Sequence, residues 1–313
     1  MTVHHRYTTV PILCFMFVVA AMAVPVPRSV AAQPPVMEQF DPAKFLDRMF
    51  GKESPRTRQD LDKIKISWAE EQRFGTQAAK AFLDGLRQRG LHVVSRGRDV
   101  QYVQRLLQTV RPFMRNARRY RHITVWVVDS DETDARCFPG GTIVVFRGLL
   151  DFARSEAALV GVLAHELSHL DHAHQLQNLR AMKLAQQTFR AGGQSFDFAR
   201  MMNNGMTLMR LFAHPFRPED ESVADRDGAT WAYRAGYDPR EMADLFARLH
   251  QRDQGAGDRV PMFLRTHPYR KDRYDAVMRL YRQLQTQAPR KNLYVGRTNL
   301  ERRISRADHE FKE

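Results

Sequence analysis

Cysteine is scarce in this sequence of 313 residues, which contains only Cys14 and Cys137. Cys14 falls in an N-terminal segment that we expect to be removed, and its removal leaves Cys137 alone. A single cysteine cannot form a disulfide within its own chain, so disulfide-stapled folds are excluded. Because 43% of the residues are hydrophobic, a chain of this length can instead bury a core of its own.

Long apolar runs are also few. The most prominent, residues 10–24, follows a polar and positive start at His4, His5 and Arg6. It has the length of a signal-peptide core rather than of a membrane span, and small residues at 30–32 provide a cleavage site. We therefore predict a signal peptide over residues 1–32 and an exported protein, periplasmic or membrane-associated and facing the periplasm. An uncleaved anchor is the alternative.

Acidic residues are outnumbered by basic ones, 35 to 49, which gives a formal net charge of +14. A basic surface suits anionic lipid headgroups, acidic partners or nucleic acid. The sequence has no nucleic-acid recognition motif, so we expect no nucleic-acid partner. Peripheral membrane contact and a solvated arginine-rich surface without a specific partner both stay open.

The most informative feature that is present is His165-Glu166-Leu167-Ser168-His169. Residues four apart share one face of a helix, so the two histidines can bind one metal ion. Glu166 is then placed to act as general base on a water at that metal, which is the arrangement of a zinc hydrolase. Small and apolar residues precede the motif, with Ser155 as a candidate cap. We predict a buried helix over residues 155–180.

A catalytic zinc site needs a third protein ligand. In one class of sites this ligand is a histidine six residues after the second one, but that position here is Gln175. The other solution is a glutamate on a later helix, and Glu221 and Asp225 share a helical face within residues 218–229. We predict that Glu221 binds zinc and that Asp225 accepts the second ring N–H of a ligating histidine. His174 is expected to contact water or a carboxylate at the helix end.

Strand patterns occur before the motif. Residues 122–128 and 142–146 predict strands, and residues 134–138, before a Pro-Gly-Gly turn, predict an edge strand that can pair with an extended peptide. Along the chain we expect the signal peptide, a linker or weakly ordered arm over 33–60, a zinc metallopeptidase domain over 61–288 and a basic C-terminal tail over 289–313. A methionine-rich stretch over residues 194–212 is predicted to belong to the core, with an adaptable lid or a membrane-facing surface as the alternative.

These motifs resemble the zinc metallopeptidase family of the CAAX prenyl proteases and the HtpX-like proteases, in its exported or periplasmic branch without the multi-span membrane domain. The resemblance covers about residues 66–280. Its matching segments are 68–75, 139–150, 165–174, Glu221 with Asp225, and Thr266-His267-Pro268 followed by Arg273. One departure is Arg136-Cys137-Phe138, where the family often has Asn-Ala-Phe; an arginine on a substrate-binding edge is expected to shift specificity.

The resemblance implies an α+β fold, mainly helical and zincin-like (gluzincin) with a small β-sheet, one Zn²⁺ per chain, and endopeptidase activity on misfolded or membrane-associated envelope proteins. It implies that His267 and Arg273 face the metal and stabilise the oxyanion, where a positive donor is needed. If His267 reaches the metal, it can instead close the open position and hold the enzyme latent. The competing hypothesis is an envelope chaperone or assembly factor with a latent or little-used zinc site. The natural substrate and the oligomeric state do not follow from the sequence.

Overall fold

The computed structural model describes residues 60–191, 216–254, 267 and 271–312, which all belong to the unit that spans Asp41–Glu313. The predicted signal peptide, almost all of the predicted arm and the methionine-rich segment lie outside the described residues. Among the helices that are described, none combines the length and the apolar character needed to cross a membrane.

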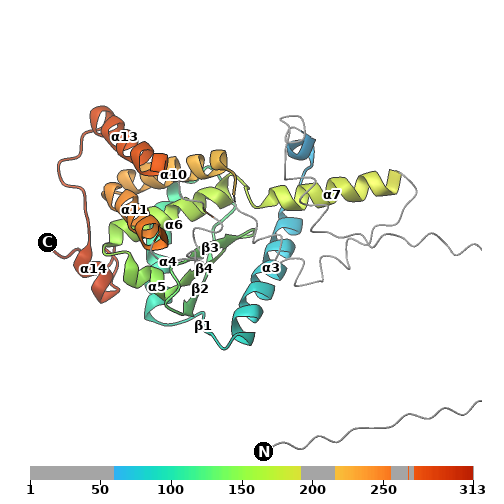
Figure 1. Cartoon of the computed structure of the whole chain (residues 1–313), viewed down its shortest axis with the longest axis horizontal. Helices are drawn as coiled ribbons and strands as arrows, with labels where there is room; N and C mark the ends of the chain where they lie inside the picture. Colours follow the sequence, from blue (N-terminus) through green and yellow to red (C-terminus); the bar gives the residue numbers. More distant parts are fainter. Residues whose placement is uncertain (1–59, 192–215, 255–266, 268–270, 313) are drawn as a thin grey trace, which may run out of the picture. The chain divides into compact units, whose positions relative to one another are not determined.

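A four-stranded sheet organises the domain (Figure 1). Its strands are β1 (His92–Val94), β2 (Thr124–Asp129), β3 (Ala135–Phe138) and β4 (Thr142–Phe146), in the spatial order β1-β2-β4-β3. β2 and β4 are parallel, and the other neighbouring pairs are antiparallel. The three predicted strands are present, and β3 lies at the sheet edge as expected. β1 is too short to produce a periodic sequence pattern.

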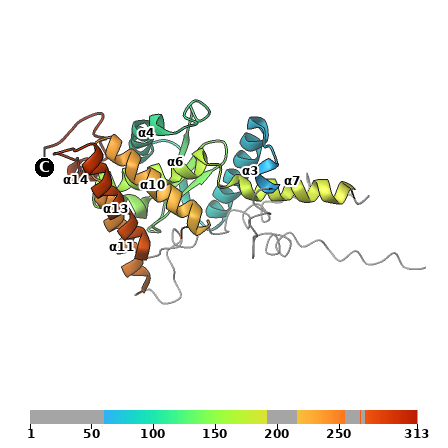
Figure 2. The ribbon, with the colours of Figure 1, turned by 90° about the horizontal axis from the view of Figure 1, so that it is seen from above.

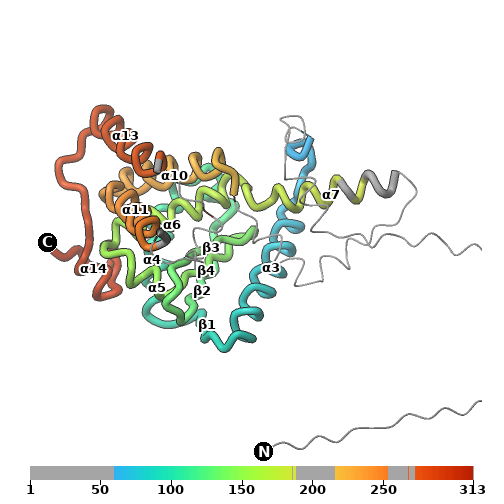
Figure 3. The backbone as a smooth tube through the Cα atoms, viewed as in Figure 1, coloured from blue at the N-terminus to red at the C-terminus, as the bar shows by residue number. Residues whose placement is uncertain are grey.

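Helices make up most of the remaining described chain, which confirms the expected α+β fold with a small sheet (Figure 3). They are α3 (Trp68–Gln88), α4 (Arg98–Val110), η1 (Arg111–Phe113), α5 (Arg147–Phe152), α6 (Glu156–Asp171), α7 (Leu176–Ala191), α10 (Pro218–Arg234), α11 (Arg240–Gln254), α13 (Lys271–Gln287) and α14 (Arg297–Arg302).

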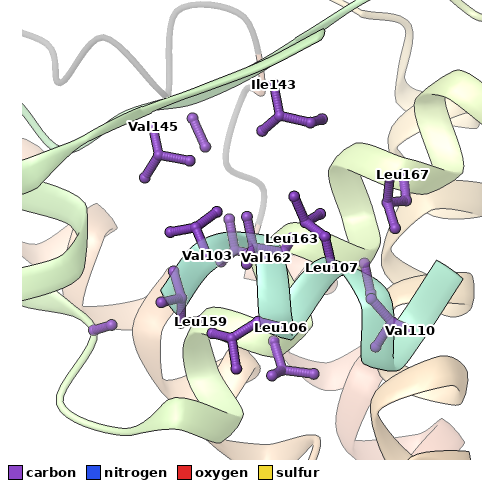
Figure 4. Close-up of a cluster of buried hydrophobic side chains, with 14 of the residues drawn as sticks. Val103, Leu106, Leu107, Val110, Ile143, Val145, Leu159, Val162, Leu163 and Leu167 are labelled. Atoms are coloured by element: carbon purple, nitrogen blue, oxygen red, sulfur yellow. The ribbon is translucent and has the colours of Figure 1, made fainter. Parts of the chain in front are cut away.

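Both faces of the sheet are covered by helices. Ile143 and Val145 of β4 face the main core, where α4 and α6 pack against the sheet (Figure 4). Val144 and Phe146 point to the opposite face and pack against α3. Because successive side chains of a strand alternate between faces, a strand that is covered on both sides needs the continuous apolar run that β4 has.

Helix α6, which carries the metal-binding motif, is buried along its whole length. Ser155 caps its start, with Oγ accepting the N–H of Ala158 at 3.1 Å. The helix ends at Asp171 rather than continuing to residue 180, because Ala173 adopts a left-handed conformation with φ of 56°. This break turns the chain into α7.

Three helices close the side of α6 away from the sheet: α10 and α11 contact α6, and α13 packs on both of them (Figure 2). Gly228 of α10 allows a close approach, since a Cβ there would lie 3.0 Å from the carbonyl oxygen of Gly161 in α6. The two helices that carry the predicted ligands are therefore in direct backbone contact.

The segment predicted as a basic tail contains α14 and contacts the start of α6. The N–H of Glu156 donates to the carbonyl of Gly296 at 3.0 Å, and its carboxylate accepts the N–H of Arg306 at 2.9 Å. The C-terminal residues therefore hold the end of the metal helix opposite to its histidines.

Candidate metal centre

Four buried side chains converge on one point: His165 and His169 of α6, Glu221 of α10, and His267, which precedes α13. Their donor atoms all lie within 4.8 Å of one another. The Nε2 atom of His165 lies 3.0 Å from Nε2 of His169 and 3.1 Å from Nδ1 of His267. Glu221 Oε1 lies 2.9 Å from the same His267 nitrogen and 3.4 Å from His169 Nε2.

This donor set fits a divalent cation. Imidazole nitrogens that converge at 3.0 and 3.1 Å can all offer their lone pairs to one metal ion when their protons are on the other ring nitrogens. Ligands about 2 Å from a tetrahedral zinc ion lie roughly 3.3 Å apart, which is close to the spacing of the four donors. Nitrogen and carboxylate ligands in this number are typical of zinc sites.

The sequence predicted the first three of these ligands, and the structure brings them together. Burial lowers the pKa of His165, and it lowers the pKa of His169 to about 4, so both imidazoles stay neutral and can coordinate. Burial alone raises the pKa of Glu221, but His267 and Arg273 outweigh it and hold that pKa well below its usual range. The carboxylate therefore stays ionised.

Asp225 lies where the sequence predicted it. Its Oδ1 is 3.0 Å from Nδ1 of His165, so this carboxylate accepts the ring N–H and leaves Nε2 unprotonated toward the cluster. Asp225 is itself held by Arg273, whose Nε donates to Oδ2 at 2.6 Å and whose Nη2 donates to Oδ1 at 2.7 Å.

Arg273 also reaches the ligand Glu221, with Nη1 2.9 Å from Oε2. It is 6% exposed, and its guanidinium faces these two carboxylates. The structure thus places Arg273 behind the metal ligands, where it balances their charge. Its role toward an oxyanion stays a prediction.

Glu166, the predicted general base, is buried beside the cluster. Its Oε2 accepts the backbone N–H of Cys137 on the edge strand β3 at 3.0 Å. Its Oε1 accepts no hydrogen bond from the described residues and lies 3.3 Å from Nε2 of His267. Burial raises the pKa of this carboxyl, as suits a group that has to take up a proton.

Two contacts of His169 were not predicted. Its Nδ1 lies 2.9 Å from Nδ1 of His174, and its ring stacks on Phe216 with the ring centres 3.9 Å apart. Phe216 has no sequence signal that distinguishes it from any core aromatic residue. His174 belongs to the segment that carries the family resemblance, but its contact depends on the end of α6 at Asp171.

A second unpredicted group fixes the hairpin that contains β3. Glu71 of α3 is 1% exposed and accepts hydrogen bonds from the Tyr120 hydroxyl at 2.6 Å, from the Gly140 N–H at 3.1 Å and from Arg119. Glu71 therefore ties the β3–β4 turn to α3. A glutamate on the apolar face of a predicted helix is the signal that could have revealed it.

Comparison with known proteins agrees with this site. The sequence profile of peptidase family M48 matches residues 98–280, a segment that includes every predicted ligand together with Glu166, His267 and Arg273. The mitochondrial metalloendopeptidase OMA1 of Arabidopsis thaliana is 29% identical over 187 residues, which cover 56% of this chain and 35% of that protein.

Two further relatives show similar levels of identity. The beta-barrel assembly-enhancing protease of Escherichia coli K12 is 26% identical over 152 residues, 46% of this chain and 31% of that protein. Metalloendopeptidase OMA1 of Schizosaccharomyces pombe is 27% identical over 147 residues, 47% of this chain and 43% of that protein. In each case the match spans less than half of the relative.

Proposed function

The chain belongs to peptidase family M48 and is a metallopeptidase, and from this premise we propose that it is a zinc-dependent endopeptidase of the cell envelope that cleaves misfolded or membrane-associated proteins. The observation that carries the proposal is the buried convergence of His165, His169 and Glu221, with the Glu166 carboxylate beside them. A metal site with an adjacent, correctly oriented carboxylate is what peptide hydrolysis requires.

In the proposed mechanism His165, His169 and Glu221 would hold Zn²⁺, while Asp225 orients His165 and Arg273 balances the charge of Glu221 and Asp225. When bound, the metal polarises the peptide carbonyl and makes water more acidic. Glu166 takes the proton of the attacking water on Oε1 and delivers it to the leaving nitrogen. The Cys137 N–H holds Oε2, so that Oε1 keeps its direction while the proton is transferred.

The proposed location and substrates draw on three observations. The N-terminal sequence predicts export, the basic composition suits an anionic membrane surface, and one group of relatives is named for assembly of β-barrel proteins. Because the chain matches only part of these relatives, their substrates come to this protein as a proposal. Unfolded envelope polypeptides are the substrate class that we propose.

The structure also supports a second candidate function. The Nδ1 atom of His267 lies 3.1 Å from Nε2 of His165 and 2.9 Å from Oε1 of Glu221. From there it can fill the metal position that a substrate and water need. A site closed in this way is latent, and the protein then acts mainly by binding unfolded envelope proteins as a chaperone or assembly factor. His267 as a stabiliser of the oxyanion is the alternative role of the same residue.

The deciding experiment measures zinc content and casein cleavage of the purified protein beside Glu166→Gln, with Glu301→Gln as the matched exposed control. We expect one zinc per chain in all three proteins, and cleavage in all but Glu166→Gln. If Glu166→Gln cleaves at the wild-type rate, the role of Glu166 is wrong. Zinc without cleavage in any of them favours the binding function.

A further inference from the structure

β3 is the edge strand that the sequence predicts to pair with an extended peptide, and its residues Ala135, Cys137 and Phe138 are buried. β3 pairs with β4 on one side only. The carbonyls of Asp134 and Phe138 accept backbone N–H groups from the β4 side, at 2.9 and 3.2 Å. Because backbone polar groups alternate along a strand, the N–H and C=O of Cys137 point the other way, off the sheet.

Both outward groups of Cys137 already have partners within the chain. Its N–H donates to Glu166 Oε2 at 3.0 Å, and its carbonyl accepts Nε2 of Gln175 at 3.0 Å. Cys137 and Gln175 are each only 5% exposed, so this hydrogen bond joins two buried residues. The side-chain amide of Gln175 makes the hydrogen bond that the backbone N–H of an added strand would otherwise make.

The Cys137 carbonyl that Gln175 contacts belongs to a residue beside the proposed general base. Cys137 is the β3 residue whose N–H binds the proposed general base. A peptide that lies along β3 with a carbonyl at the metal cluster therefore presents one of its nearest N–H groups to the Cys137 carbonyl. Gln175 occupies the place of that N–H.

Gln175 is held in place by the chain break after α6. It follows the left-handed Ala173 and immediately precedes α7, and Leu176 N–H donates to the Ala173 carbonyl at 3.0 Å. Farther along, α7 is tied to α3 by the ion pair of Lys183 with Glu70 at 2.7 Å, near the N-terminal end of α3, where α7 crosses it in Figure 1. Within the described part of the chain, Cys137 is the only hydrogen-bond partner found for the Gln175 amide.

We propose that Gln175 caps the substrate-binding edge of β3 and competes with the substrate backbone for the Cys137 carbonyl. This inference rests on the proposed peptidase function. The ligand class is an extended polypeptide that places a backbone N–H at the Cys137 carbonyl. Because proline has no N–H, a proline at that position of the peptide cannot displace Gln175. The cap is distinct from closure by His267, because Gln175 blocks the peptide backbone rather than the metal.

The test measures binding separately from cleavage. In a Glu166→Gln background, binding of fluorescein-labelled casein is compared among Gln175, Gln175→Ala and Gln175→Met, which keeps the length of the side chain but removes the donor. Gln177→Ala is the matched control, since Gln177 lies in the first turn of α7 and donates to Asp62 at 3.1 Å instead. Zinc content and thermal unfolding establish that all variants are folded.

We expect Gln175→Ala to lower the Kd for casein about three- to tenfold, the range set by the net contribution of one hydrogen bond. Gln175→Met is expected to lower it less, and Gln177→Ala to leave it unchanged. With an extended synthetic casein peptide, methylation of alternate backbone nitrogens removes the N–H row on one side of the strand. Two such peptides exist, one methylated at the odd and one at the even backbone nitrogens. For one of them Gln175→Ala is expected no longer to lower the Kd.

A Kd that is unchanged or higher in Gln175→Ala, or a gain that persists with both methylated peptides, overturns the cap. Cleavage by the Glu166-containing protein is scored independently. Cleavage without a gain in binding overturns the cap alone, whereas a gain in binding without any cleavage supports the cap and overturns the peptidase function.

Discussion

His174 lies against the ring of His169, with their Nδ1 atoms 2.9 Å apart. Because His169 offers Nε2 to the cluster, its proton is on Nδ1 and is donated to His174. Burial lowers the pKa of His174 to about 2, so this ring stays neutral and accepts that proton on its unprotonated Nδ1. Its own proton is then on Nε2, which lies 3.6 Å from Asp220 Oδ1.

We therefore expect His174→Phe, which keeps the ring but removes the acceptor, to weaken metal binding about 10- to 100-fold. His122→Phe is the control, since His122 is exposed and lies outside the cluster. Competition with a chromogenic chelator measures the zinc Kd of both variants. Equal affinities would show that His174 does not orient His169.

The contact of His267 with the cluster leads to a second prediction. The His267→Ala variant keeps His165, His169 and Glu221, which suffice to hold zinc. If His267 closes the remaining position, its removal opens that position to water and substrate. We expect casein cleavage to rise severalfold with zinc content unchanged, relative to the exposed control His309→Ala. A fall in rate with zinc retained instead supports the oxyanion role.

The local features of the site follow from the sequence because they depend on spacing within single elements. Two histidines four apart and a glutamate four residues before an aspartate each define one helix face, and the structure brings those two faces together. The strands around residues 124–146 are equally local, because their periodicity is visible within a few residues.

The features that could not be predicted depend on contacts between elements. A continuous helix to residue 180 directs His174 away from His169, and only the left-handed Ala173 turns it back. Alanine gives no sequence signal for that conformation, which is uncommon for residues other than glycine. The sequence shows at Gln175 only the absence of a histidine ligand, because the contact of Gln175 with Cys137 joins residues 38 positions apart.

Helix α3 approaches the β3–β4 turn so closely that Gly75 has no room for a side chain. A Cβ at this position would lie 1.6 Å from the carbonyl oxygen of Pro139. Gly75→Ala is therefore expected to lower the free energy of unfolding by about 1–3 kcal/mol or more, as overpacking does. Gly85→Ala in the same helix is the control, and its better helix propensity predicts a small gain. Urea unfolding followed by circular dichroism measures both changes, and equal stabilities would contradict the close approach.

The Glu70 carboxyl leads to a prediction about how stability depends on pH. Three hydrogen bonds involve this residue. Its Oε2 accepts the Ser67 N–H at 2.8 Å, its N–H donates to Ser67 Oγ at 3.2 Å, and its Oε1 accepts Lys183 Nζ at 2.7 Å. The hydrogen bond from Lys183, followed by that from the Ser67 backbone, lowers the pKa of Glu70 from 4.5 to about 2. A carboxyl whose pKa is lower in the folded state stabilises the fold fully above its unfolded pKa, and this stabilisation is lost as the pH falls through the folded pKa.

We therefore expect wild type to be more stable than Glu70→Gln at pH 7, with a difference that shrinks between pH 4.5 and 2. The Glu70 side chain is 34% exposed, so salt should weaken the part contributed by Lys183. Urea unfolding at pH 7, 4 and 3 measures the difference, with Glu301→Gln as the control. A chelator is present throughout, because metal release has a pH dependence of its own. A difference that stays constant or grows toward pH 3 would mean that the ionised Glu70 carboxylate does not stabilise the junction of α3 and α7.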